Sequence, residues 1–494
     1  MNSLVIQIYR RRFLEYFLLS IILITGFLVR LYKINNPLAD WHSWRQADTA
    51  SVTRTYSETG INLLFPRYHD ISSIQSRIFN PQGYRFVEFP LFNILHAILI
   101  KNFPVFSLEV WGRLLSIICS AFSTLLLFLI GRRFLGKIGG LLTAFFYSFI
   151  PFNIYFTRVI LPEPLSVMLG IAGLWLFIKY FDTSQNLFIY LSAVAFSLAI
   201  LVKPFTIFYL IPVAGLILEK YRSFRGILND PKSLTIFLSF IAILFVPFLL
   251  WRAWISRFPE GIPLFAWVFN GDHIRFRPSF WRWIFAERLG RLILGVWGLI
   301  PFCLGILKTN KRSRFILWFL LGMFLYVLIV ASANVRHDYY QALIIPAVSL
   351  ALASGSIALW SAPGLNKNLS RIILVFSVFL MILVGAVQIK DNFLIIHPEI
   401  LEAGAEVDRL VPKNALVVAP YNGDTAFLYQ TKRWGWPAID DSIDNIITKG
   451  ADYYVSVSPN DDDTKMIISR FQIIKSTDKY VIVDLHKPLI NKKP

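Results

Sequence analysis

Apolar stretches long enough to cross a lipid bilayer recur along most of this chain. A crossing helix needs about 20 predominantly apolar residues, because the hydrocarbon core is about 30 Å thick. The first stretch covers residues 13–31, directly after Arg10, Arg11 and Arg12, and no small-residue cleavage site follows it. We interpret it as an uncleaved signal anchor with a cytoplasmic N-terminus. Ten further spans are expected, near residues 107–131, 138–153, 162–181, 187–202, 204–219, 233–253, 287–307, 314–333, 338–360 and 370–389.

The composition agrees with a protein that crosses a membrane about eleven times. Of the 494 residues, 56% are hydrophobic and only 16% are charged, whereas soluble domains carry about 25% charged residues. This balance excludes a soluble globule, which would expose too much apolar surface, and it excludes a disordered chain. The formal net charge is +19. Part of that excess reflects cytoplasmic loops, and a further excess on the other face would suit an anionic ligand.

Basic residues give the orientation. If the first span runs outward, every inner connection carries Lys or Arg and the chain obeys the positive-inside rule throughout. The apolar piece 89–103 is too short for a crossing, so we assign it to an interfacial or re-entrant helix within the first outer loop. The inner-loop cations are Arg132, Arg133, Lys137, Lys179, Lys220, Arg222, Arg225, Lys232, Lys308, Lys311, Arg312, Arg314, Lys367 and Arg371.

Two long segments are expected outside the membrane. The first outer loop, residues 32–106, is rich in aromatic and charged residues with amphipathic helical patterns. Beyond residue 390 the composition becomes polar, which predicts a membrane region at 1–389 and a soluble extracytoplasmic α/β domain at 390–494. In that domain, strands are expected at 415–420, 426–430, 453–457 and 480–485, and helices at 401–410 and 443–449. Cys119 and Cys303 both lie in apolar runs, which excludes a disulfide framework and a thiolate metal site.

The first outer loop contains the most informative short stretch, LADWHSWRQADTA, at residues 38–50. It places Asp40, His42, Arg45 and Asp48 around two tryptophans. An ordinary interfacial helix, with Trp at the headgroups and charges in water, is one interpretation. A cluster of catalytic or binding side chains is the other.

Three further places carry polar side chains at outer membrane boundaries. Glu163 lies between two prolines in RVILPEP, either as a functional carboxylate or as a helix-capping one. The stretch NVRHDYYQ holds Arg336, His337 and Tyr339, and could equally be a solvated loop with a tyrosine belt. Lys203 precedes a proline among apolar residues, where snorkelling to the interface is the alternative role.

All of these places fall on one membrane face in this topology. Cations at the lipid boundary suit the phosphate of a lipid, and a carboxylate beside them could act as general base toward a hydroxyl. That combination describes transfer of a sugar from a lipid-phosphate donor, because the leaving phosphate needs positive charge and the incoming hydroxyl must lose its proton.

An ordered set of motifs supports this interpretation through a family resemblance. The acidic stretch after the first span is followed by EFPL at Glu88–Leu91, RRxxG at Arg132–Gly136, an acidic residue after Arg158, Lys203-Pro204, and RHDYY beginning at Arg336. Over residues 1–390 the chain resembles the GT-C glycosyltransferases of the protein-O-mannosyltransferase and aminoarabinose-transferase type (glycosyltransferase families 39 and 83). The resemblance implies the GT-C fold, a polyprenyl-phosphate sugar donor, and inverting transfer on the outer face.

The resemblance also implies roles for individual residues. The family's catalytic Asp in the first outer loop and its second acidic residue correspond to Asp40 and Glu163. The usual Asp-Glu pair is absent because Trp41 follows Asp40, and alignment on Arg45 would favour Asp48 or His42 instead; Glu88-Phe89-Pro90 replaces the usual Lys-Pro-Pro. The donor phosphate is expected to contact Arg45, Arg158, Lys203, Arg336, His337 and Tyr339, with His42 and Glu88 elsewhere in the pocket.

The expected partners are a polyprenyl-phosphate sugar, a lipid, glycan or protein acceptor, and membrane lipids, with no nucleic acid. Some GT-C branches use a divalent metal, but no clear ligand set is visible here, so neither a metal nor a cofactor is predicted. The expected location is the plasma membrane. A polyprenyl-linked lipid or glycan flippase or transporter is the alternative function, although its inverted repeats and mid-span broken helices are not visible in the sequence. A membrane-anchored binding protein is a third interpretation.

Overall fold

The computed structural model describes residues 3–221, 230–308, 310, 313–361 and 366–489, and these form two compact units. Unit 1 comprises Met1–Ile34, Arg113–Arg252 and Phe265–Asp391. Unit 2 comprises Asn35–Gly112, Ala253–Leu264 and Asn392–Pro494. The units change at Asp391, close to the predicted boundary at residue 390, but the first outer loop, which was expected to belong with the membrane region, is grouped with the C-terminal region.

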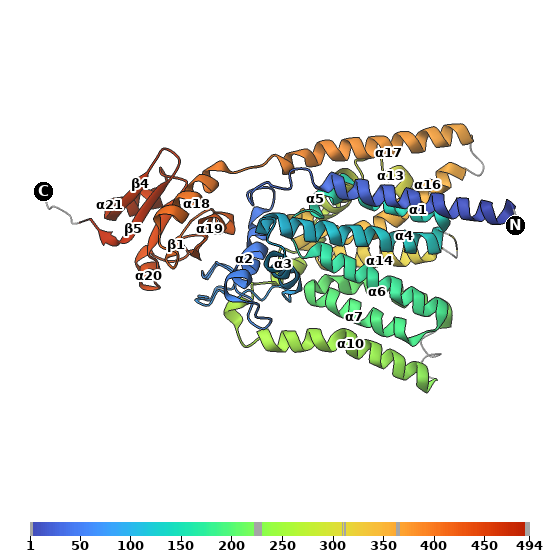
Figure 1. Ribbon diagram of the computed structural model, residues 1–494, viewed down its shortest axis with the longest axis horizontal. Helices are drawn as coiled ribbons and strands as arrows, with labels where there is room; N and C mark the ends of the chain where they lie inside the picture. The colour runs from blue at the N-terminus through green and yellow to red at the C-terminus, as the bar shows by residue number, and fades with distance from the viewer. Residues whose placement is uncertain (1–2, 222–229, 309, 311–312, 362–365, 490–494) are drawn as a thin grey trace. The chain divides into compact units, whose positions relative to one another are not determined.

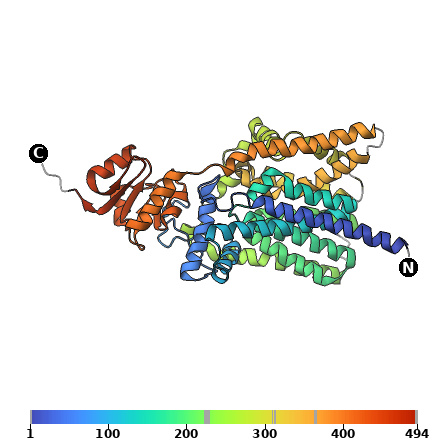
Figure 2. The same cartoon turned by 45° about the horizontal axis from the view of Figure 1, so that its top comes forward.

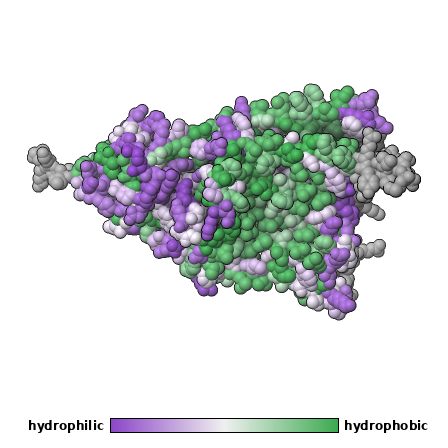
Figure 3. All heavy atoms as spheres, viewed as in Figure 1, coloured by the Kyte–Doolittle hydropathy of each residue, from purple (hydrophilic) through white to green (hydrophobic). Residues whose placement is uncertain are grey.

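Unit 1 is a bundle of apolar helices that lie side by side (Figures 1 and 2). Within the part of the chain that the structure describes, five helices are long and apolar enough to cross a membrane: Phe13–Arg30 within α1, α4, α6, α10, and the helix that contains α17. Shorter apolar helices accompany them, and apolar side chains cover the bundle surface in view (Figure 3). The long helices are α1 (Ser3–Arg30), α4 (Leu108–Phe149), α6 (Glu163–Thr183), α7 (Asn186–Val202), α8 (Leu210–Tyr221), α10 (Pro231–Ile255), α14 (Arg314–Ile329), α16 (Ile345–Ser361) and α17 (Lys367–Ile389).

Short helical pieces connect the long helices of unit 1. They are α5 (Pro151–Phe156), η1 (Pro204–Tyr209), α11 (Ala266–Asn270), η3 (Ile274–Phe276), α12 (Pro278–Trp281), the π-helix η4 (Arg282–Ile293), α13 (Leu299–Leu307), α15 (Ala331–Arg336), η5 (Asp338–Leu343) and η6 (Lys390–Phe393).

Two breaks in this bundle bear on the predicted spans. Within α4, Gly136 has φ 81° and ψ −176°, a conformation that favours glycine, so the chain bends where a connection between two spans was expected. The expected span at 287–307 is not one continuous helix. Its π-helical part ends at Ile293, and Gly295 and Val296 both have positive φ before α13 begins. The count of eleven crossings remains a prediction.

Unit 2 is built on a five-stranded sheet with the order β2-β1-β3-β5-β4. The strands are β1 (Leu416–Val418), β2 (Trp434–Trp436), β3 (Tyr453–Ser456), β4 (Phe471–Ser476) and β5 (Val481–Pro488). β1 pairs in parallel with β2 and β3, whereas β5 is antiparallel to β3 and β4. Its helices are α18 (Pro398–Leu410), α19 (Thr425–Thr431), α20 (Ile443–Thr448) and α21 (Asp462–Arg470), with η2 at Pro259–Gly261.

The first outer loop is part of the same unit. It contributes α2 (Ser43–Thr59) and the short apolar helix α3 (Leu91–Asn102), and it extends the sheet at the β2 edge. There the amide of Ile71 donates to Gly435 O at 2.9 Å, and the amide of Gly435 donates to His69 O at 2.9 Å. Ile71 also belongs to the sheet's core with Val418, Trp436 and Tyr454. The unit therefore has a hydrophobic core drawn from both ends of the chain.

The predicted C-terminal elements agree with the structure in part. Strands at 415–420, 453–457 and 480–485 and both predicted helices have counterparts. The strand predicted at 426–430 is wrong, because this stretch is the helix α19, whose first turn is capped by the side chain of Asp424. β2, β4 and α21 were not predicted.

Candidate active site

The start of α2 places the first candidate carboxylate inside unit 2. Asp40 is 2% exposed, and Gln46 Nε2 donates to its Oδ1 at 2.7 Å. His42 has φ 57° and ψ 37°, a left-handed turn that allows α2 to begin at Ser43. Its ring lies 4.8 Å from that of Trp41 between centroids. The turn and the Gln46 hydrogen bond together fix the Asp40 carboxylate.

The other two charged candidates on α2 are held in ion pairs. Arg45 is buried and pairs with Glu88, which lies just before α3. Asp48 is enclosed completely: its Oδ2 accepts from Arg85 Nη2 at 2.6 Å and its Oδ1 accepts from Thr425 Oγ1 at 2.7 Å. Both oxygens of Asp48 therefore link the first outer loop to the C-terminal region.

The surroundings of Asp48 contain two more carboxylates, the buried Asp70 and the half-buried Asp424. Asp70 accepts from Tyr68 Oη at 3.2 Å and from the Ser72 amide at 2.8 Å, and burial raises its pKa to about 6. Asp424 accepts from the Ala426 amide at 2.7 Å and from Ser43 Oγ at 3.3 Å, and burial raises its pKa to about 6 as well. Desolvation is the largest cause in both cases.

Unit 1 holds a second group, centred on Glu163 and Lys203. α6 begins at Glu163, with prolines on both sides that suit a helix start. α7 ends at Val202, and Lys203 is extended with φ −145° and ψ 103° because Pro204 follows it. α6 and α7 form a hairpin joined by two residues, so the start of one lies beside the end of the other. There Lys203 Nζ and Glu163 Oε1 are 2.6 Å apart, with side chains only 5% and 1% exposed.

Aromatic rings from the segment after α15 surround this ion pair. Lys203 Nζ lies 4.9 Å from the ring centroid of Tyr340 and 5.9 Å from that of Tyr339. His337 stacks on both tyrosines, at centroid distances of 6.4 Å and 5.7 Å. The structure therefore brings together Glu163, Lys203, Tyr339 and His337, which come from three separate parts of the sequence.

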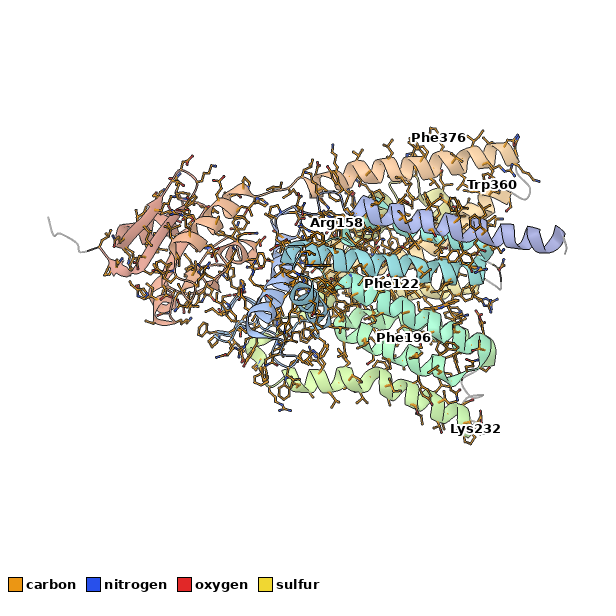
Figure 4. The ribbon with its side chains drawn as sticks, in the orientation of Figure 1. Phe122, Arg158, Phe196, Lys232, Trp360 and Phe376 are labelled. Atoms are coloured by element: carbon orange, nitrogen blue, oxygen red, sulfur yellow. The ribbon has the colours of Figure 1, made fainter. Side chains whose placement is uncertain are left out.

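Two predicted phosphate contacts have other partners. Arg336 pairs with Asp272 at 2.5 Å, and its guanidinium lies 5.6 Å from the Trp267 ring, at an exposed position. Arg158 is fully buried and donates through Nη2 to Lys33 O at 2.7 Å (Figure 4). That contact holds the chain just after α1. The nearby Arg30 donates to Thr157 Oγ1 at 2.7 Å and supports the same junction.

Sequence reasoning missed several of these residues. Arg85 and Thr425 were not assigned to the surroundings of α2, because they lie far from it along the chain. Arg288 was also missed: it donates to Val335 O at 2.8 Å and lies 3.8 Å from Asp338, which positions the His337–Tyr340 segment. Arg85 could have been suspected only from its position, three residues before the candidate pocket residue Glu88.

Among the residues that the structure describes, no three His, Cys, Asp or Glu side chains gather in a way that could hold an ion. The carboxylates Asp48 and Glu163 are each next to a cation instead. The arrangement suits proton transfer and charge neutralisation by side chains.

Comparison with known proteins identifies the fold. Residues 90–251 match the family model of dolichyl-phosphate-mannose-protein mannosyltransferases. No curated protein sequence shows a significant match to the chain. ArnT from Cupriavidus metallidurans in the apo state is 12% identical, with TM-score 0.64, over 94% of this chain and 97% of that one.

Two other structures give the same result. ArnT from Cupriavidus metallidurans bound to undecaprenyl phosphate is 12% identical with TM-score 0.61, over 94% of this chain and 97% of that one. The oligosaccharyltransferase of Archaeoglobus fulgidus is 13% identical with TM-score 0.56, over 89% of this chain and 68% of that one. This chain therefore has the GT-C fold of multi-pass membrane glycosyltransferases and is similar to ArnT and to the protein mannosyltransferases.

Proposed function

We propose that this chain is a membrane glycosyltransferase that moves a sugar from a polyprenyl-phosphate donor to a hydroxyl group of a lipid, glycan or protein acceptor. The GT-C fold, the mannosyltransferase match over residues 90–251 and the similarity to an ArnT structure bound to undecaprenyl phosphate support this class. The reaction takes place on the outer face of the plasma membrane, with the N-terminus in the cytoplasm.

The observation that carries the proposal is the buried Glu163–Lys203 pair beneath Tyr339 and Tyr340. An ammonium group that is removed from water needs a nearby negative charge, and Glu163 supplies it in the resting protein. When the bond to the sugar breaks, the lipid phosphate gains a negative charge. A preorganised cation in a site with little water stabilises that charge more than it would in bulk water. Lys203 is the proposed group for this role.

The proposed reaction is a single displacement. Asp40 takes the proton of the acceptor hydroxyl, and the hydroxyl oxygen forms a bond to the anomeric carbon. The bond between that carbon and the phosphate oxygen breaks, and its electron pair leaves with the lipid phosphate. The configuration inverts, because no enzyme nucleophile takes part. Asp40 is preferred over Asp48 as the base because Asp40 corresponds to the family's catalytic Asp, whereas Asp48 is held in an ion pair with the buried Arg85.

The remaining candidates are assigned supporting roles. Arg45, aligned by Glu88, His337 and Tyr339 are proposed to bind the phosphate or the sugar. Arg158 is proposed as a positioning residue, since its guanidinium holds the chain after α1. Arg336, which is exposed beside Asp272, is the weakest phosphate contact of the set, and His42 shapes the turn before α2.

The experiment that tests the proposal is reconstitution of the purified chain with polyprenyl-phosphate sugars. Mass spectrometry of glycolipids and glycoproteins from cells with and without the gene identifies the sugar and the acceptor for this assay. The double variant Glu163→Gln/Lys203→Met removes both charges together, so neither partner is left buried as a lone ion. We expect it to fold and to lose at least about 10²-fold of transfer, as removal of a preorganised charge-stabilising group does.

The matched control is Lys232→Met, at an exposed cation of the same bundle, which should transfer at the parental rate. Transfer by the double variant at the parental rate would remove Lys203 from the mechanism. If cells with and without the gene contain the same glycosylated products, the transferase assignment itself is overturned.

A further inference from the structure

A wide apolar groove lies in unit 1, away from the residues assigned above. Its volume is about 990 Å³, and α4, α16 and α17 form its walls. Nearly all of its lining is aliphatic or aromatic. The lining side chains include Leu142 and Phe145 of α4, Trp360 of α16, and Val375, Val378 and Phe379 of α17. A groove of this volume with a mostly apolar lining can accept hydrocarbon chains.

The groove opens sideways from the bundle. Ile138, Val375 and Phe379 on its rim are 68%, 62% and 59% exposed. Exposing such apolar side chains to water would cost free energy, whereas contact with lipid tails would not. Since α4 and α17 belong to helices that can span a membrane, lipid is the medium that this opening faces.

One end of the groove is cationic. Lys137 is part of the lining and its side chain is half exposed, 3.6 Å from Glu15 Oε2. Arg371, one turn before Val375 on α17, lies with its guanidinium 4.7 Å from the Trp360 ring. Ser370 Oγ donates to Leu359 O at 2.7 Å and ties α17 to α16 at this level. Arg132 also pairs with Glu15, at 2.9 Å, so one carboxylate is shared by two cations and cannot neutralise both.

This cationic end is the end of the bundle where the N-terminus lies. Figures 1 and 2 both show the start of α17 and the N-terminal end of α1 on that side, and Figure 4 labels Trp360 near it. In the predicted topology it is the cytoplasmic end, where basic pockets between transmembrane helices bind anionic headgroups.

We propose that this groove binds one anionic glycerophospholipid, with its acyl chains along α4 and α17 and its phosphate between Lys137 and Arg371. The apolar walls match the acyl chains, and the two cations match a headgroup of net negative charge. A zwitterionic lipid would fill the same walls but gain less at the cationic end. The inference does not depend on the transferase assignment.

The test measures lipid retention by the full-length chain with native mass spectrometry. The purified protein is titrated with phosphatidylglycerol or with phosphatidylcholine of the same acyl chains. We expect a clear preference for phosphatidylglycerol that falls by about five-fold for each cation removed, the effect expected of a basic residue near an anionic lipid surface. Lys137→Gln/Arg371→Gln should therefore lose the preference, whereas Lys232→Gln, on the same side of the bundle in Figure 4, should keep it. Equal retention of the two lipids by the parent, or an unchanged preference in the double variant, overturns the proposal.

A second pair of variants tests the apolar part without changing any charge. Val378→Trp fills the groove, and Phe376→Trp, on the exposed face of α17 outside the lining, is the matched control (Figure 4). We expect phosphatidylglycerol retention to fall at least five-fold in the first and to stay unchanged in the second. A third titration uses polyprenyl phosphate. If it displaces phosphatidylglycerol at lower concentration than phosphatidylglycerol itself requires, the groove is a carrier-lipid site and the phospholipid assignment fails.

Discussion

At the scale of single residues, the two aspartates near the start of α2 have different neighbours. Asp40 accepts a hydrogen bond from the neutral side chain of Gln46, whereas Asp48 pairs with the buried Arg85 and accepts from Thr425. We expect Asp40→Asn to keep its hydrogen bond from Gln46 and its thermal stability. Transfer should fall about 10²–10⁴-fold, the contribution typical of a general base. Transfer rate and unfolding midpoint, measured on the same samples, give the comparison.

The reverse pattern is expected at Asp48. Asp48→Asn leaves the Arg85 guanidinium buried without its carboxylate, which costs about 3 kcal/mol. The unfolding midpoint of this variant should drop, whereas the transfer rate per folded molecule should change little. If Asp48→Asn is stable and inactive while Asp40→Asn remains active, the base is Asp48 and the assignment above is reversed.

Asp424 makes the stability of unit 2 depend on pH. Burial raises its pKa to about 6, above the value of about 3.9 in an unfolded chain. The folded chain therefore binds more protons than the unfolded chain between about pH 4 and pH 6. This contribution to stability is complete below pH 4 and is lost as the pH rises through 6.

Asp424→Asn removes this dependence while its side-chain oxygen can still cap α19. We expect the variant to exceed the parent by about 2 kcal/mol at pH 7.5 and to differ little at pH 4, as measured by thermal unfolding at both values. Asp461→Asn, at the exposed cap of α21, is the control and should shift the midpoint equally at both pH values. A gain for Asp424→Asn that is the same at pH 4 and pH 7.5 would contradict a raised pKa.

At the scale of elements, what could be predicted followed from local pattern. Hydrophobic stretches located most of the long helices. Pro162, Pro164 and Pro204 lie where α6 starts and α7 ends, and the expected spans placed Glu163 and Lys203 on the same membrane face but did not pair them. The segment 426–430 was misassigned because AFLYQ is a short apolar run, which fits a buried strand as well as a helix. Asp424 before it is a typical helix cap. β4 could not be recognised, because its exposed side chains do not alternate cleanly.

Long-range pairing could not be predicted from local pattern at all. Nothing near Asp48 indicates that Arg85 and Thr425 will contact it, since these partners are separated from it by 37 and 377 positions along the chain. The same holds for the strand-like contact between Ile71 and Gly435. Candidate residue types could be found in the sequence, whereas their ion-pair partners depend on the packing of the whole unit.

The Ile71–Gly435 contact allows a test at the level of the sheet. Gly435 has φ 155°, and a Cβ there would lie 1.8 Å from Val417 O, so any side chain forces β1 and β2 apart. We expect Gly435→Ala to increase hydrogen exchange in peptides covering both 416–418 and 68–72. Gly423→Ala also has positive φ but meets nothing within 4 Å, and it should cost only about 1 kcal/mol without opening the 68–72 segment. Unchanged exchange at 68–72 in Gly435→Ala would show that this segment is held by other contacts.

At the scale of the whole molecule, the C-terminal region completes the core that the first outer loop needs. Arg54 stacks at 3.7 Å on the ring of Tyr429 and donates to its carbonyl oxygen at 2.8 Å. Gln430 Nε2 donates to Leu38 O at 3.0 Å, two residues before Asp40. Removing residues 390–494 would therefore expose apolar surface of the loop and release the stretch that carries the proposed base.

A chain that ends at residue 389 tests this dependence. We expect it to insert into membranes, because the apolar helices of unit 1 remain. Limited proteolysis should then cut within residues 35–112, and sugar transfer should be lost, whereas a chain that ends at residue 489 should be resistant and active. Donor binding, measured separately with a polyprenyl-phosphate sugar, should persist in the shorter chain if Lys203 and Tyr339 hold the phosphate. Parental transfer by the chain ending at 389 would mean that Asp40 is positioned without the C-terminal region, and the C-terminal region would then be only an accessory to this enzyme.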